Sequence, residues 1–173
     1  MTQLAPSNKS NITLIGMPGV GKTTLGRILA RQLDYRFLDT DIVIQTKTGQ
    51  PLQDILNQQG EAKFLDIEKE VVLELNDLDH TIISPGGSVI YTVEAMHHLK
   101  AISTIIYLKD KFENIQKRIP NLDSRGIVGL HGKTLYDLFK ERELLYETYA
   151  DKTLILVGKS NNQIGQELRS LCE

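Results

Sequence analysis

The chain contains no tryptophan and a single cysteine among its 173 residues. That cysteine, Cys172, excludes a disulfide within the chain and argues against a cysteine-based zinc site. No apolar run approaches the length of a membrane span, and residues 1–10 lack the apolar core of a signal peptide. We therefore expect a cytoplasmic protein with no membrane partner.

Neither sign of charge is in excess, since 20 Lys and Arg residues stand against 22 Asp and Glu residues and the basic ones are scattered. This balance argues against a nucleic-acid-binding face but does not exclude the binding of small anionic ligands. The length suits one domain of ordinary size. We expect a flexible N-terminal segment over residues 1–10, a single domain over 11–173, and a monomer.

One motif stands out against this plain background: residues 16–23 read Gly-Met-Pro-Gly-Val-Gly-Lys-Thr and match the phosphate-binding pattern G-x-x-x-x-G-K-[ST]. A short β-branched run precedes the motif and a helical pattern follows it, as such a loop requires. Lys22 would reach the β- and γ-phosphates of a nucleotide, and Thr23 would ligate Mg²⁺. The predicted nucleotide-binding residues are Gly16, Gly19, Val20, Gly21, Lys22, Thr23 and Thr24. An ordinary glycine-rich turn between strand and helix is the alternative.

The rest of the chain alternates between short apolar runs and amphipathic stretches. Predicted strands cover 11–15, 35–39, 81–84, 103–108 and 153–157; predicted helices cover 24–33, three segments within 41–76, 93–99, 111–118, 134–150 and 161–171. This alternation predicts an α/β fold of three layers, with a five-stranded parallel sheet flanked by helices on both faces. Residues 119–132 lack periodicity and form a candidate lid loop.

In such a fold ligands bind beyond the carboxyl ends of the strands, so residues that follow the strands are site candidates. Asp39 and Asp41 follow the second strand, and the Pro85-Gly86-Gly87 turn follows the third. One carboxylate beside the phosphate loop can serve Mg²⁺, while the other orients an acceptor hydroxyl and accepts its proton. The alternative makes Asp41 a helix N-cap.

Two arginines are candidates for the same site. Arg125 lies in the loop over 119–132, where a closing lid would bring it onto the transferring phosphoryl group. Arg142 lies on the next predicted helix and could reach the acceptor. The alternatives are an exposed loop arginine and a member of a surface ion pair, respectively.

Taken together, these residues resemble the shikimate kinase family, P-loop kinases that phosphorylate shikimate with MgATP. The resemblance covers nearly the whole chain and rests on Gly16–Thr23, Asp39-Thr40-Asp41, Gly60-Glu61 with Phe64 and Glu68, Gly86-Gly87, Arg125, and Glu141-Arg142 before Leu145-Tyr146. It implies that Asp39 serves the metal and that Asp41 binds acceptor hydroxyls and acts as the base. It also implies a catalytic Lys22 and Arg125, and acceptor binding by Gly86, Gly87 and Arg142.

Two departures from the family pattern fall on the acceptor side. Leu65 stands where the pattern has an arginine, and Pro85 stands where it has a glycine. Lys69, one turn beyond Leu65, is the nearest local replacement cation. The leading expectation is phosphorylation of shikimate, one alternative is another acceptor such as a gluconate-like sugar acid or a polyol, and a third is a non-catalytic nucleotide-binding module.

Overall fold

The computed structural model describes residues 9–119 and 127–172. Its centre is a parallel sheet whose strand order is β2-β3-β1-β4-β5. The strands are β1 (Asn11–Ile15), β2 (Arg36–Asp39), β3 (Thr81–Ser84), β4 (Ser103–Lys109) and β5 (Lys152–Ile155). β1 pairs with β3 on one side and with β4 on the other. The connections from the neighbouring strands therefore lead to opposite edges of the sheet, and the switch point of the strand order lies at the carboxyl end of β1.

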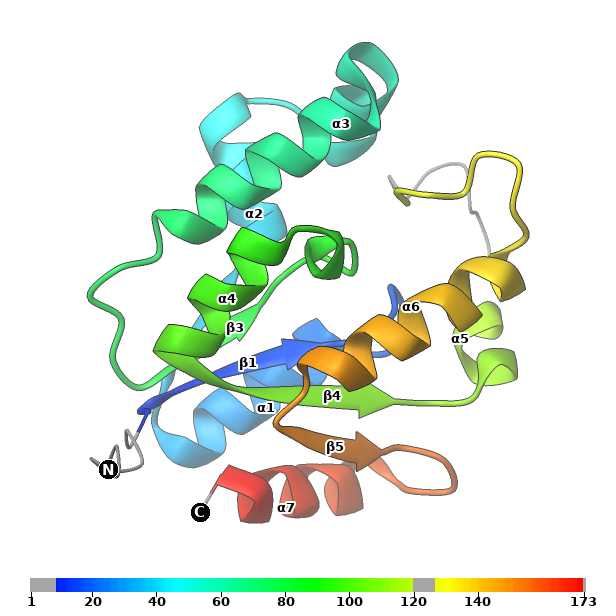
Figure 1. The fold of residues 1–173 in the computed structure, drawn as a ribbon. Coiled ribbons are helices and arrows are strands. Elements are labelled where there is room, and N and C mark those ends of the chain that lie inside the picture. Colours follow the sequence, from blue (N-terminus) through cyan, green and yellow to red (C-terminus); the bar gives the residue numbers. More distant parts are fainter. Residues whose placement is uncertain (1–8, 120–126, 173) are drawn as a thin grey trace, which may run out of the picture.

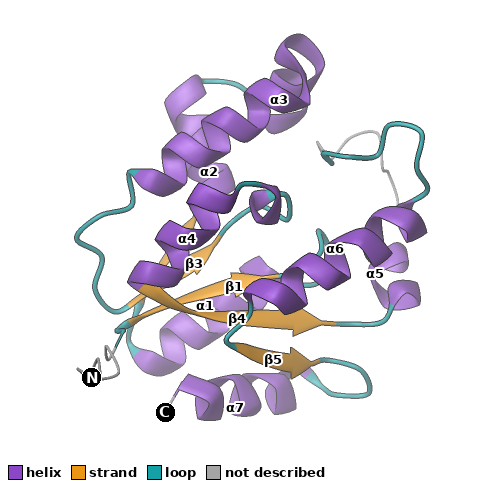
Figure 2. Ribbon diagram, viewed as in Figure 1, coloured by secondary structure: helices purple, strands orange, loops and turns teal. Residues whose placement is uncertain are grey.

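Helices cover both faces of this sheet and form the two outer layers (Figures 1 and 2). One face carries α1 (Lys22–Leu33) and α7 (Asn161–Cys172), and the other carries α4 (Val93–Ile102) and α6 (Leu135–Tyr149). The remaining helices are α2 (Thr40–Thr48), α3 (Leu52–Leu73), the short 3-10 helix η1 (Val89–Tyr91) and α5 (Phe112–Arg118). The predicted three-layer α/β fold is confirmed.

Alternation along the strands explains why the sheet needs a cover on each side. In β4, Ile105 and Tyr107 pack with α4 and α6, while Ile106 and Leu108 pack with α1 and α7. All four side chains are buried. Successive residues of a strand point to opposite faces, so a strand that is apolar throughout must be covered twice.

A third and smaller apolar cluster lies between α2 and α3. It contains Ile44, Ile55, Phe64 and Val71, and it is closed by Val128 from the segment before α6. Gly60 interrupts α3 with non-helical angles (φ 81°, ψ 171°), which divides it into two helices as its sequence predicts. These helices therefore form a separate lobe beside the sheet, as Figure 1 shows.

The boundaries predicted from the sequence need small corrections. Helix α1 begins at Lys22 instead of residue 24, and α4 extends to Ile102 instead of residue 99. Strand β5 ends at Ile155 instead of residue 157. The 3-10 helix over Val89–Tyr91 was not predicted, because three residues are too few for a periodic signal.

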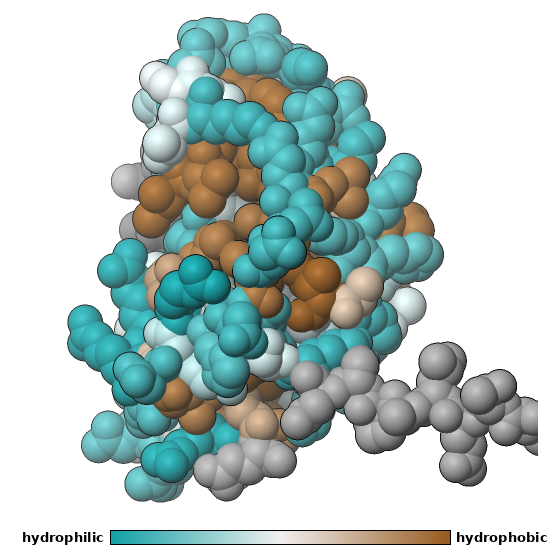
Figure 3. Space-filling view, turned by 90° about the vertical axis from the view of Figure 1, so that its left-hand side faces the viewer, coloured by the Kyte–Doolittle hydropathy of each residue, from teal (hydrophilic) through white to brown (hydrophobic). Residues whose placement is uncertain are grey.

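Part of the predicted organisation lies outside the described residues: residues 1–8 of the N-terminal segment and residues 120–126 of the lid loop. No helix in the described ranges combines the length and apolar character needed to cross a membrane. The face at the amino ends of the strands carries apolar patches between hydrophilic side chains (Figure 3). The features that follow lie at the opposite, carboxyl end of the sheet.

Candidate active site

A cleft of about 920 Å³ opens at the carboxyl ends of the strands. It is lined by the loop after β1, the residues that follow β2 and β3, the start of α5, the loop after β5, and Arg142 of α6. Residues that are far apart in sequence thus line one cleft, at the switch point of the strand order beside β1 where such folds bind ligands.

The phosphate loop forms the floor of this cleft. Its residues Gly19, Val20, Gly21, Lys22, Thr23 and Thr24 line the cleft, whereas Gly16 lies beneath it against Leu108. The ammonium group of Lys22 donates to the carbonyl oxygens of Gly16 (2.8 Å) and Met17 (3.1 Å). Burial lowers the pKa of Lys22 to about 8. These hydrogen bonds hold the ammonium group beside the N-terminus of α1, where backbone N–H groups favour the binding of an anion.

Asp39 and Thr23 meet beside the phosphate loop. The hydroxyl of Thr23 donates to Oδ2 of Asp39 at 3.1 Å, and the N–H of Asp41 donates to Oδ1 of Asp39 at 3.0 Å. Asp39 is therefore the N-cap of α2, and the alternative in which Asp41 is the cap is wrong. A hydroxyl and a carboxylate oxygen suit Mg²⁺, which completes its shell with water and phosphate oxygens.

Asp41 is free of the capping role and lines the cleft. Burial, followed by the nearby charge of Asp39, raises the pKa of Asp41 to about 6, and Lys22 opposes this shift. A carboxylate with a raised pKa is a stronger base than an ordinary aspartate. The arrangement can therefore accept a proton from a hydroxyl placed between Asp41 and the phosphate loop.

The turn after β3 brings the backbone close to three side chains. A Cβ added to Gly86 would stand 2.6 Å from Oε1 of Glu68 and 3.0 Å from Oδ1 of Asp41, and one added to Gly87 would stand 2.9 Å from Nη1 of Arg142. Only glycine allows such an approach. These two residues therefore form a bare backbone wall between the acidic and the basic side of the cleft.

Glu68 is buried behind this wall. The hydroxyl of Ser88 donates to its two oxygens at 3.1 Å and 3.0 Å. Burial raises the pKa of Glu68 to about 7, the Ser88 hydrogen bond opposes the shift, and the charge of Asp41 adds to it. In the sequence, Glu68 is marked only by the family pattern, and its pairing with Ser88 does not follow from spacing.

Arg142 faces the cleft from α6 and is 1% exposed. Its Nη2 donates to the carbonyl oxygen of Val128 at 2.7 Å, and its guanidinium lies over the ring of Tyr91, 5.2 Å from the centroid. Within the described residues, no carboxylate lies within ion-pair distance of it. The alternative in which Arg142 belongs to a surface ion pair is therefore wrong.

The side of the cleft that faces the α2–α3 lobe is apolar. Leu52, Phe64, Ile127 and Val128 line it. Leu65 instead packs into the apolar cluster of the lobe, and Lys69 points to Asp66, whose carboxylate lies 3.4 Å from its ammonium group. Lys69, the nearest local candidate to replace the missing arginine, is not among the residues that line the cleft.

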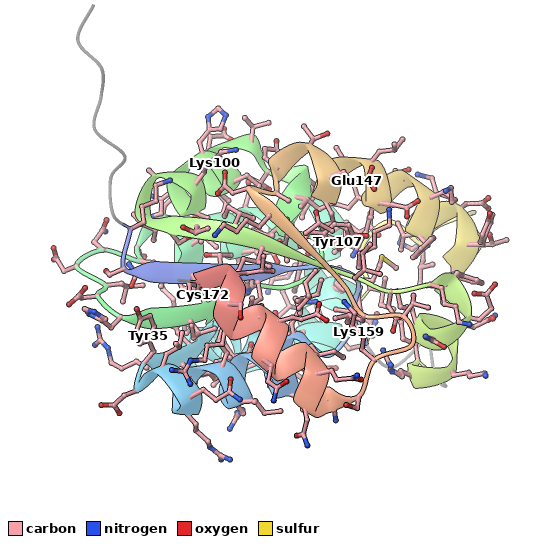
Figure 4. All side chains as sticks on the ribbon, turned by 90° about the horizontal axis from the view of Figure 1, so that it is seen from below. Tyr35, Lys100, Tyr107, Glu147, Lys159 and Cys172 are labelled. Atoms are coloured by element: carbon pink, nitrogen blue, oxygen red, sulfur yellow. The ribbon has the colours of Figure 1, made fainter. Side chains whose placement is uncertain are left out.

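The opposite end of the cleft has residues that the sequence analysis missed. Arg118 of α5 lines it and is held by the buried carboxylate of Asp110 at 2.9 Å. Lys159 lines it from the loop between β5 and α7, and Asn161 lines it from the first position of α7. Figure 4 shows Lys159 in this loop, at the other end of α7 from Cys172. No motif marks these positions, because they come together only when the strands are aligned.

The structure thus brings most of the predicted residues to one cleft: the phosphate loop, Asp39, Asp41, Gly86, Gly87 and Arg142. Arg125 lies outside the described residues, and its role stays a prediction.

The site combines a phosphate loop at the switch point of a parallel sheet, a carboxylate, and a buried arginine with no carboxylate within ion-pair distance among the described residues. This combination defines a P-loop kinase that acts on a small molecule. The family model described as "Shikimate kinase" matches residues 18–173. The chain therefore belongs to the shikimate kinase family, whose members are ATP-dependent kinases.

Individual relatives agree with this assignment. The chain is 33% identical to a shikimate kinase of Persephonella marina over 91% of its length and 96% of the relative's. It is 38% identical to a shikimate kinase of Rippkaea orientalis over 84% of its length and 78% of the relative's. A solved structure, shikimate kinase from Acinetobacter baumannii in complex with shikimate, matches 94% of this chain and 92% of that chain with a TM-score of 0.86 and 31% identity.

Proposed function

We propose that this protein transfers the γ-phosphate of ATP to a hydroxyl group of shikimate. The observation that supports this most is that Asp41 and Arg142 line one cleft beside the phosphate loop, with Arg142 buried and without a carboxylate partner in the described part of the chain. A buried cation without a carboxylate partner is costly, and an anionic ligand offsets that cost. Shikimate carries both the carboxylate that Arg142 requires and the hydroxyl groups that Asp41 requires.

In the proposed reaction the acceptor oxygen forms a bond to the γ-phosphorus while the bond to the leaving ADP oxygen breaks. Asp41 orients the hydroxyl and takes its proton, and Lys22 stabilises the charge on the phosphate oxygens. Arg142 and the backbone at Gly86 and Gly87 hold the acceptor in line. We assign Arg125 to the closing lid, where its cation neutralises charge on the transferring group.

Thr23 and Asp39 are the residues we propose to hold Mg²⁺. When bound, the ion neutralises charge on the phosphate oxygens of ATP. A Mg²⁺ titration of activity tests this assignment: Asp39→Asn should raise the concentration for half-maximal activity about tenfold or more, while Asp34→Asn, a surface change in the same region, should leave it unchanged. An equal response in both variants would remove Asp39 from the metal site.

The experiment that tests the proposed function is a coupled assay of ADP release with and without shikimate. We expect shikimate-dependent turnover, a loss of at least about a hundredfold in Asp41→Asn, and an acceptor KM raised at least about tenfold in Arg142→Met. Mass spectrometry of the product confirms the added phosphate. ATP binding without turnover of any hydroxy acid would instead support the non-catalytic nucleotide-binding module.

A second acceptor class is favoured by one observation, the apolar packing of Leu65 where the family pattern has an arginine. Loss of one hydrogen bond to a charged group costs about 1.5–3 kcal/mol, or roughly 10- to 150-fold in affinity. The same assay with gluconate and with uncharged polyols separates the two. Higher kcat/KM for one of these than for shikimate would make it the acceptor.

We further propose that the protein acts as a monomer in the cytoplasm, without a nucleic-acid or membrane partner. Its balanced charge supports this, since it has no basic excess. Light scattering of the purified protein and fractionation of cells test the two statements.

A further inference from the structure

Two tyrosines, Tyr91 and Tyr146, interact with the Arg142 guanidinium, and the ring of Tyr91 is the one that faces it. Tyr91 lies at the end of η1, shortly after the Gly86-Gly87 turn, and its ring faces the guanidinium at 5.2 Å. A cation over an aromatic ring is stabilised most where water is excluded, and Arg142 is 1% exposed. The ring therefore offsets part of the cost of burying this charge.

The hydroxyl group of Tyr91 has a defined direction. It donates to Oε1 of Glu141 at 2.6 Å, so its lone pairs are left to face Nε of Arg142, which lies at 3.4 Å. The second oxygen of Glu141 accepts from Lys133. Lys133 thus balances the charge of Glu141, and the phenol stands between Glu141 and Arg142.

This arrangement differs from an ion pair in one important respect. A carboxylate against Arg142 would hold it in place but would also cancel its charge and compete with an anionic ligand. A neutral phenol restrains the guanidinium and leaves the charge available. Nη1 remains toward Gly87, on the cleft.

Tyr91 also contacts the lobe and the segment before α6. It packs against both the apolar cluster on the α4–α6 face of the sheet and the cluster between α2 and α3. Its hydroxyl oxygen would stand 3.6 Å from a Cβ on Gly129, the residue after Val128 whose carbonyl accepts from Arg142. The ring is therefore braced from several sides and cannot turn away from Arg142 without disturbing them.

We propose that Tyr91 is a positioning residue that aims the guanidinium of Arg142 into the cleft without neutralising it, and thereby sets the affinity for an anionic acceptor. The inference rests on the proposed function for the identity of that acceptor. With leucine at position 65, Arg142 is the cation on which this affinity depends, so its restraint by Tyr91 has a large effect.

Steady-state kinetics of three variants test the proposal. Tyr91→Phe keeps the ring and removes the hydroxyl, and should raise the KM for shikimate about threefold to tenfold. Tyr91→Leu removes both and should raise it about thirtyfold. In both, kcat should stay within about threefold and the KM for ATP should not change. Tyr136→Phe, on the exposed part of α6, should match the unmodified protein.

Two outcomes would overturn the proposal: an unchanged KM for shikimate in both Tyr91 variants, or parallel changes in the KM for ATP. If the unmodified protein does not turn over shikimate, the proposed function fails separately. The role of Tyr91 is then decided by denaturation of Tyr91→Leu, Arg142→Met and the double variant. We expect non-additive changes in unfolding free energy, and additive changes would refute the contact as a restraint on Arg142.

Discussion

Glu68 and Asp41 meet at the backbone of Gly86, with oxygens 2.6 Å and 3.0 Å from the point where a Cβ would stand. The buried carboxylate of Glu68 and the half-buried carboxylate of Asp41 are thus neighbours, and the pKa values of both are raised, to about 7 and about 6 respectively. Burial is the main cause for each. Asp41 lines the cleft, whereas Glu68 lies behind the Gly86-Gly87 wall, where the hydroxyl of Ser88 donates to it.

The raised pKa of Asp41 predicts the pH at which activity begins to fall on the acid side of the pH–activity profile. Asp41 must be deprotonated to accept a proton, so kcat/KM for the acceptor should fall about tenfold per pH unit below about pH 6. An ordinary aspartate would place this fall near pH 4. Initial rates between pH 5 and 8 measure it, with re-assay at pH 7.5 as a control for inactivation. Constant kcat/KM down to pH 5 would contradict the assignment.

Glu68 predicts a dependence of stability on pH. Since its pKa rises from 4.5 to about 7 on folding, its favourable contribution is complete below pH 4.5 and is lost as the pH rises through 7. Gln at position 68 accepts from Ser88 but does not titrate. Glu68→Gln should therefore gain stability relative to the unmodified protein across this window, by up to about 3 kcal/mol.

Urea unfolding at pH 4.5, 6 and 8 measures this difference. Glu70→Gln, a neighbouring change on α3, is the control and should give no such trend. A difference between Glu68→Gln and the unmodified protein that stays constant with pH would contradict the burial of a titrating Glu68.

The close approach of Gly87 predicts a strong effect of one added methyl group. In Gly87→Ala the new Cβ would stand 2.9 Å from Nη1 of Arg142 and 2.9 Å from Cδ of Pro18. Both the arginine and the ring of Pro18 must shift, so the KM for the acceptor should rise about tenfold or more, and the KM for ATP should rise as well because Pro18 belongs to the phosphate loop. Gly165→Ala on α7 controls for a general effect of substitution, since its Cβ would meet only the flexible end of Gln32 at 3.3 Å and Ile28 at 3.7 Å.

Leu65→Arg tests whether a cation at position 65 reaches the acceptor. An arginine at position 65 lies three residues before Glu68 on α3, where an ion pair forms readily, and it would lower the pKa of Glu68. It also adds a cation near the acceptor, so the KM for shikimate should fall about tenfold or more. Leu65→Met is the apolar control. An unchanged KM in Leu65→Arg would show that this position does not reach the acceptor.

How far the sequence predicts this site depends on the range of the interactions. The phosphate loop and the Asp39–Asp41 segment carry their geometry within a few consecutive residues, so spacing identifies them. Tyr91 and Ser88 have no such local signal. Each acquires its partner from an element distant in sequence, so no pattern in the chain predicts the pairing.

The sequence by itself determined the alternation of strands and helices and the phosphate loop. The spacing of apolar residues and the residue types at turns decide these features within a few consecutive positions. Only the tertiary structure decided that Asp39 caps α2 while Asp41 faces the cleft, and that Arg142 is buried on the ring of Tyr91. It also decided that Lys69 lies beside Asp66 and outside the lining of the cleft. The reason is physical: burial, close approach and raised pKa values depend on which surfaces meet when the layers pack.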